Sequence, residues 1–105
     1  MQRLDVTGLP DVPSAAAAVF YSEWLGQVQA KLAQGSLALV FPPAGHDHAA
    51  WRLSAVQTLA RENAPARLNA IASDDPAAIA EALVYLGAAD GITGQYLPLD
   101  SIGAG

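Results

Sequence analysis

The residues of this sequence most suited to chemistry are two histidines that flank an aspartate, His46-Asp47-His48. Two imidazoles and a carboxylate could hold a metal ion or relay a proton. A metal site usually needs a third or fourth ligand, and the sequence has no further histidine and no cysteine. A catalytic triad would need a nucleophile, and Ser54 lies about one and a half helical turns further along. The other interpretation is a polar loop in which Asp47 caps the next helix, and we expect no bound metal.

Composition narrows the classes of function. The chain of 105 residues is long enough for one domain, residues 1–105. Hydrophobic residues make up 52% and charged residues 14%, which excludes intrinsic disorder. The net charge of −5 leaves no basic patch for nucleic acid. There is no apolar run of the ~20 residues that a membrane helix needs, and the start lacks the layout of a signal peptide. We therefore expect a cytoplasmic protein with neither nucleic-acid nor membrane partners.

Hydrophobic periodicity predicts strands that alternate with helices. The apolar run at residues 37–41, between Gly35 and Pro42, is typical of a buried parallel strand. The expected strands are residues 3–9, 37–41, 67–72 and 92–99, and the expected helices are residues 15–34, 48–63 and 77–86. This β-α-β-α-β-α-β alternation predicts an α/β fold with a four-stranded parallel sheet and three helices.

Two of the predicted helices carry recognisable start signals. Ser14 precedes the apolar periodicity of the first helix and is the expected N-cap. Asp74 or Asp75, followed by Pro76, marks the start of the third helix, because an aspartate cap and a proline in the first turn both favour that position.

Three segments of the sequence resemble the C-terminal half of the short-chain dehydrogenases/reductases. LARENAP and RLNAIA, at residues 59–65 and 67–72, are similar to that family's passage from a helix into a strand. DPAAIAEALVYL, at residues 75–86, resembles its penultimate helix, and ITGQYLPLD, at residues 92–100, resembles its closing strand. A weaker similarity lies at residues 35–40. The resemblance implies a minimal half-Rossmann domain, a truncated and degenerate member of that family.

The same resemblance implies a nicotinamide cofactor and a Ser, Tyr and Lys catalytic set, and the sequence departs from both. No GxxxGxG or GxGxxG turn is present to hold a pyrophosphate. Two prolines, residues 42–43, stand where the catalytic serine should end the central strand. The tyrosine and lysine positions fall on Gly45 and Ala49, or on His48 and Arg52 if the register slides by three. We therefore expect no cofactor, no catalytic residues and no dehydrogenase activity.

These observations predict a non-catalytic protein that acts through assembly, in a structural or regulatory role. Its partner would be a second copy, most simply in a two-fold dimer, or a full-length short-chain dehydrogenase. The first two predicted helices carry more apolar stripes than contact with one sheet requires. Their aromatic residues recur at helical spacing, and such residues more often belong to a core or an interface than to a ligand-stacking site. The candidate interface consists of Phe20, Tyr21, Trp24, Val28, Trp51, Ala55 and Leu59.

The alternative is a small enzyme or ligand-binding protein that uses the loop of residues 42–48. This loop follows the central strand, and open α/β sheets bind ligands at the carboxyl ends of their strands. The candidate pocket would be lined by His46, Asp47, His48 and Arg52. A concave, partly polar pocket at this loop would favour the alternative, whereas a filled loop would favour assembly.

Overall fold

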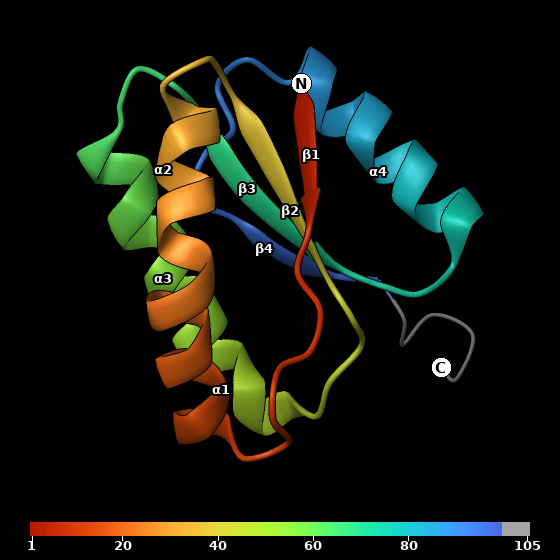
Figure 1. Ribbon diagram of the computed structural model, residues 1–105. Helices are drawn as coiled ribbons and strands as arrows, with labels where there is room; N and C mark the ends of the chain where they lie inside the picture. The colour runs from red at the N-terminus through yellow and green to blue at the C-terminus, as the bar shows by residue number, and fades with distance from the viewer. Residues whose placement is uncertain (100–105) are drawn as a thin grey trace.

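The computed structural model describes residues 1–99, and its centre is a four-stranded parallel sheet (Figure 1). In sheet order, which is also chain order, the strands are β1 (Gln2–Asp5), β2 (Leu37–Phe41), β3 (Leu68–Ala72) and β4 (Tyr96–Pro98). Every residue of β2 and β3 is buried, as expected for parallel strands covered on both faces. The predicted fold class is confirmed, although the two outer strands are shorter than predicted. Asp100, the last residue of the resembled closing strand, lies outside the described residues.

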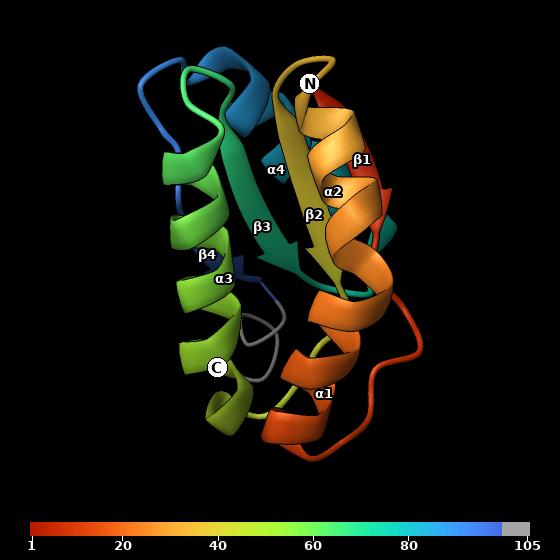
Figure 2. The same ribbon diagram turned by 60° about the vertical axis from the view of Figure 1, so that its left-hand side comes forward.

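Helices cover the two faces of the sheet unequally (Figure 2). One face carries α1 (Pro13–Val19), the π-helical turn η1 (Phe20–Trp24), α2 (Leu25–Leu32) and α3 (Ala49–Glu62), and the other carries α4 (Pro76–Ala88). The main hydrophobic core lies beneath the first group and includes Leu37, Leu39 and Phe41 of β2. Ile79 and Leu86 of α4 are buried on the opposite side. In residues 1–99, no helix has the length and apolar character needed to cross a bilayer.

The third crossover of the sheet has the opposite hand from the first two (Figures 1 and 2). The connections from β1 to β2 and from β2 to β3 pass over one face and are right-handed, which is the usual hand. The strand β4 continues in the same direction, but α4 lies on the other face, so the β3-α4-β4 connection is left-handed.

Among residues 1–99, no helix covers the α4 side of β1. The side chains of Arg3 and Asp5 are exposed there, and the Arg3 Nε lies 2.7 Å from an Asp5 carboxylate oxygen. The hydrogen bond to Asp5 raises the pKa of the Arg3 guanidinium, which therefore stays charged at physiological pH. Charged side chains at this position discourage the edge strand from pairing with another chain.

The first helix, predicted to be regular, contains the π-helical turn η1 in its middle. Its buried residues Ala16, Phe20, Val28 and Leu32 are separated by multiples of four. In a regular helix each step of four residues drifts by about 40° around the axis, so such a stripe would turn away from the sheet. The wider turn of η1 offsets part of that drift and keeps the four residues on the core side.

The structure corrects one predicted helix cap and confirms the other. The Ser14 cap is wrong, because the helix begins two residues earlier than predicted, at Pro13, and Val12 precedes it without a side-chain cap. Proline suits this position because its missing N–H would have no partner in the first turn. For α4 the cap is Asp75, whose Oδ1 accepts a hydrogen bond of 3.0 Å from the Ala77 N–H.

The Asp75 cap gives a direct test of the start of α4. We expect Asp75→Ala to lower the free energy of unfolding by about 1 kcal/mol, because the Ala77 N–H loses its acceptor. Asp74→Ala is the matched control and should change stability little, since Asp75 and not Asp74 fills the cap. Urea unfolding followed by tryptophan fluorescence measures both, and equal losses in the two variants would contradict the assignment.

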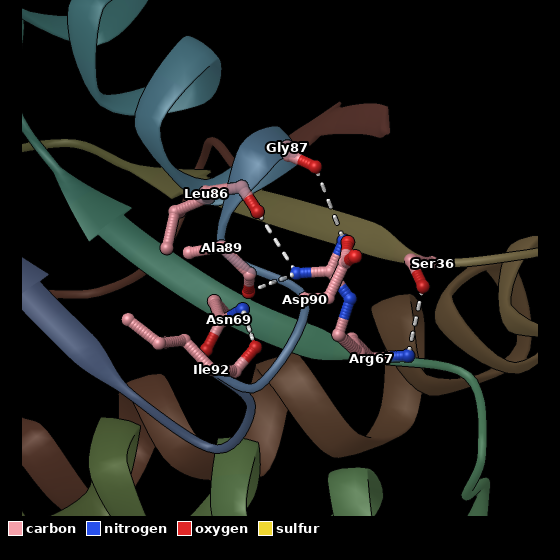
Figure 3. Close-up of polar contacts among 8 residues, drawn as sticks. All are labelled: Ser36, Arg67, Asn69, Leu86, Gly87, Ala89, Asp90 and Ile92. Atoms are coloured by element: carbon pink, nitrogen blue, oxygen red, sulfur yellow. Dashed lines mark hydrogen bonds and ion pairs between the residues drawn. The ribbon is translucent and has the colours of Figure 1, made fainter.

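Side chains from the start of β3 hold the segment between α4 and β4 (Figure 3). The Arg67 guanidinium donates to the carbonyls of Leu86 and Ala89, each at 2.8 Å, and so satisfies carbonyls at the end of α4. The side-chain amide of Asn69 donates to the Ile92 carbonyl at 3.0 Å. This framework lies at the end of the sheet opposite to the candidate site.

Candidate functional site

A cleft opens beyond the carboxyl end of β2, at the loop of residues 42–48. Its volume is about 420 Å³, and the segment from Leu9 to Asp11 forms its other wall. The polar side chains that line it are Asp11, Asp47, His48 and Arg52. The loop is thus concave and partly polar, at the edge of the sheet where α/β proteins bind ligands.

His48 links the start of α3 to the segment before α1 by a hydrogen bond. It is only 7% exposed, and its Nε2 lies 2.8 Å from the Asp11 carbonyl oxygen. The Trp51 indole Nε1 donates to its Nδ1 at 3.0 Å. A carbonyl only accepts and an indole N–H only donates, so the imidazole is neutral and carries its proton on Nε2. Both ring nitrogens are occupied, and His48 therefore serves as a structural tie rather than as a metal ligand or general base.

The other two members of the His46-Asp47-His48 cluster are exposed. They lie in a short 3₁₀ turn, η2 (His46–His48), and α3 follows it directly. The predicted Asp47 cap is wrong, because α3 has no side-chain cap at its start. Among residues 1–99, no three His, Asp or Glu side chains converge as a metal site requires. The cluster therefore contributes Asp47 and His48 to the cleft, His46 does not line it, and the three residues do not assemble a relay.

Arg52 is the most unusual residue of the site. Its side chain is 2% exposed, and its Nη1 donates to the Pro42 carbonyl at 3.0 Å and to the Tyr96 hydroxyl at 3.1 Å. The guanidinium carbon lies 4.5 Å from the centroid of the Phe41 ring, a cation–π contact. No carboxylate of residues 1–99 pairs with it, and its Nε is buried without a hydrogen-bond partner. A buried positive charge in this state is costly, so the position calls for an explanation.

Tyr96, the first residue of the edge strand β4, also belongs to the site. Its hydroxyl accepts the hydrogen bond from Arg52, and its ring lies edge-on to Phe41 at 6.4 Å between centroids. The two partners are 44 residues apart in the sequence. No local pattern could have paired them.

The residues predicted to form an interface divide into two groups. Phe20, Val28, Ala55 and Leu59 are at most 2% exposed and belong to the core, so a second copy cannot reach them in this structure. Trp24 and Trp51 are half-buried against the same core, and Tyr21 is 43% exposed. The surplus apolar stripe is thus largely internal, because each helix of this layer packs against both the sheet and the helix beside it.

A parallel sheet with helices on both faces and a ligand-sized cleft at its carboxyl edge defines a Rossmann-like α/β protein. A family model described as short chain dehydrogenase-like protein matches residues 4–99 of the 105. The chain therefore belongs to the short-chain dehydrogenase-like family. Searches of curated proteins and of solved structures found no match.

The residues at the cleft do not fit the dinucleotide that the family resemblance implies. A pyrophosphate is normally held by backbone N–H groups of a glycine-rich turn at a helix N-terminus. Here the first helix begins at Pro13, which has no N–H, and the Asp11 carboxylate lines the cleft just before it. In the register shifted by three, the expected phenol and ammonium positions hold His48 and Arg52, which are buried and make hydrogen bonds with other residues. We derive no hydride-transfer step from this arrangement.

Proposed function

We propose that this protein is a non-catalytic member of the short-chain dehydrogenase-like family that acts through assembly in the cytoplasm. The observation that carries the proposal is the outer face of α4. Of the 13 residues in this helix only Glu81 is charged, and the exposed residues include Val84 at 74% and Tyr85 at 55%. A helix that is apolar all round is normally covered on every side.

The partner that we propose for this face is a second copy of the chain. A two-fold axis along α4 would cover Val84 and Tyr85 of both copies at once, because the same surface then faces itself. The shallow surface beside Tyr85 continues onto Leu97 and Leu99 at the β4 edge of the sheet, which enlarges the apolar area. The assembly would thus use α4 rather than the first two helices. A full-length short-chain dehydrogenase is the other partner of this class.

Light scattering behind a sizing column tests the assembly. We expect a species of about twice the chain mass of 10.8 kDa, and we expect Val84→Glu with Tyr85→Glu to convert it to the monomer. Leu53→Glu is the matched control, since Leu53 is 37% exposed on α3, in the layer first predicted to form the interface. A wild-type monomer would refute self-assembly, and dissociation by Leu53→Glu alone would move the contact to the helix layer.

The non-catalytic part of the proposal is tested by titration with NAD(H) and NADP(H). Because the cleft lacks a pyrophosphate cradle, we expect no saturable change in the fluorescence of Trp24 and Trp51 below about 100 μM cofactor. An active short-chain dehydrogenase measured alongside serves as the positive control. Saturation below that concentration would overturn this part and leave the assembly test unaffected.

A second candidate function is the binding of a small molecule in the cleft of residues 42–48. The specific observation in its favour is Arg52, a buried cation at the cleft without a carboxylate among residues 1–99. Assembly and ligand binding are compatible, since the cleft and the outer face of α4 share no residue.

A further inference from the structure

We propose that the cleft binds a small zwitterion, an amino acid-like molecule whose carboxylate pairs with Arg52 and whose ammonium group lies near Asp11 and Asp47. The inference rests on the second candidate function and specifies the ligand that the cleft would take.

The carboxylate part follows from the guanidinium. Nη1 is fully engaged, because it donates to the Pro42 carbonyl and to the Tyr96 hydroxyl. Nε and Nη2 make no hydrogen bond within residues 1–99, and of these two only Nε is fully enclosed. Nη2 is therefore the free donor of Arg52 that is not fully enclosed, and Arg52 lines the cleft. A carboxylate is the anion that matches a guanidinium edge, and it would neutralise a charge that is otherwise buried alone.

The ammonium part follows from the other charges at the cleft. Two exposed carboxylates, those of Asp11 and Asp47, line the same cleft. His48 adds no charge, because its Nδ1 accepts the indole hydrogen bond of Trp51. One cation and two carboxylates repel a phosphate or a dicarboxylate, but they suit a ligand with one charge of each sign.

The size and walls of the cleft restrict the ligand further. A volume of about 420 Å³ is at the lower end of the range for small-molecule sites. Pro10, Pro42 and Pro43 contribute apolar walls of restricted conformation, which suit a short hydrocarbon spacer between the two charged groups.

A series of ω-amino acids tests the inference, because it varies the distance between the two charges. Glycine, β-alanine, γ-aminobutyrate and 5-aminovalerate are compared by NMR titration with the carboxylates and the amines of the same chain length, and with inorganic phosphate. We expect at least one amino acid to bind about tenfold more tightly than its matched carboxylate and its matched amine. The indole N–H resonance of Trp51, whose ring is 5.8 Å from the Arg52 guanidinium carbon, reports occupancy directly.

Two variants test the carboxylate contact and the ammonium contact of the ligand separately. Arg52→Met should abolish binding, and Asp47→Asn, at an exposed position, should reduce the affinity of the amino acid to that of the matched carboxylate. Asp74→Asn is the control, because this exposed aspartate lies outside the cleft. Equal binding of carboxylate and amino acid, tighter binding of phosphate, or an unchanged affinity in Asp47→Asn would overturn the inference while ligand binding stands. Binding of none of these probes would overturn both.

Discussion

Truncation of Phe20 to alanine is expected to lower the free energy of unfolding by about 3–5 kcal/mol. The Phe20 side chain is fully buried at the junction of η1 with the sheet and α3. Its ring lies 5.9 Å from that of Phe41 and 5.7 Å from that of Trp51, between centroids. Alanine would leave a cavity that neither neighbour can fill, because both rings are also held by Arg52. Urea unfolding of wild type and variant, followed by fluorescence or circular dichroism, measures the loss.

The same variant distinguishes a core residue from an interface residue. If Phe20 served a dimer contact, its contribution would weaken as the protein is diluted, because assembly depends on concentration. If Phe20 instead packs in the core, its contribution to the free energy of unfolding is the same at every protein concentration. Tyr21→Ala is the matched control, since this neighbouring ring is exposed and meets Phe20 only edge-on. A loss for Phe20→Ala that is no larger than that for Tyr21→Ala would show that the residue does not hold the core.

The sequence predicts those parts of the fold that depend on local pattern. The run at residues 37–41 is strand β2 without any change of bounds, because a continuous apolar stretch between Gly35 and Pro42 suits only a buried strand. The parallel sheet follows from the alternation of elements. The hand of the third crossover could not be predicted, since residues 76–88 are apolar enough to lie on either face and the usual rule favours the other hand.

The burial of Phe20 and Val28, two of the candidate interface residues, can be traced to η1. A regular helix would place the apolar residues of the first helix on two stripes, one of which exceeds what the sheet contact requires. The π-helical turn and the contact with α3 together bury a wider arc, so both Phe20 and Val28 are internal. Conversely, α4 exposes Val84 at 74% and Tyr85 at 55%, more than Tyr21 at 43% or Leu53 at 37% in the other helix layer.

The location of the site could be predicted from the sequence, but the contacts among its side chains could not. Residue types drew attention to His48 and Arg52, and their spacing placed them at the start of a helix. Their roles depend on partners distant in the sequence: the Asp11 carbonyl for His48, and the Tyr96 hydroxyl for Arg52. Such pairings depend on the tertiary fold, because the loop before α1 and the strand β4 both contact residues at the start of α3.

Replacement of Asn69 by leucine is expected to lower the free energy of unfolding by about 2–4 kcal/mol. Asn69 is fully buried on β3, where its amide donates to the Ile92 carbonyl at 3.0 Å and its Oδ1 accepts from the Gln95 N–H at 3.1 Å. Leucine has a similar volume, so the loss comes from the two partners that remain buried without hydrogen bonds rather than from a cavity. Urea unfolding measures the total loss, and hydrogen exchange at the Gln95 amide locates it.

Asn63→Ala provides the control for Asn69, because the Asn63 side chain bonds to the Leu59 carbonyl of its own helix and is only half-buried. We expect a loss below about 1 kcal/mol for this local contact.

The effect of Asn69→Leu should also reach the other end of the sheet, since Gln95 leads directly into Tyr96, the partner of Arg52. Faster exchange at Gln95 together with a shifted Trp51 indole resonance would connect the two ends. An unaltered Gln95 amide in a destabilised variant would show that the loss arises elsewhere on β3.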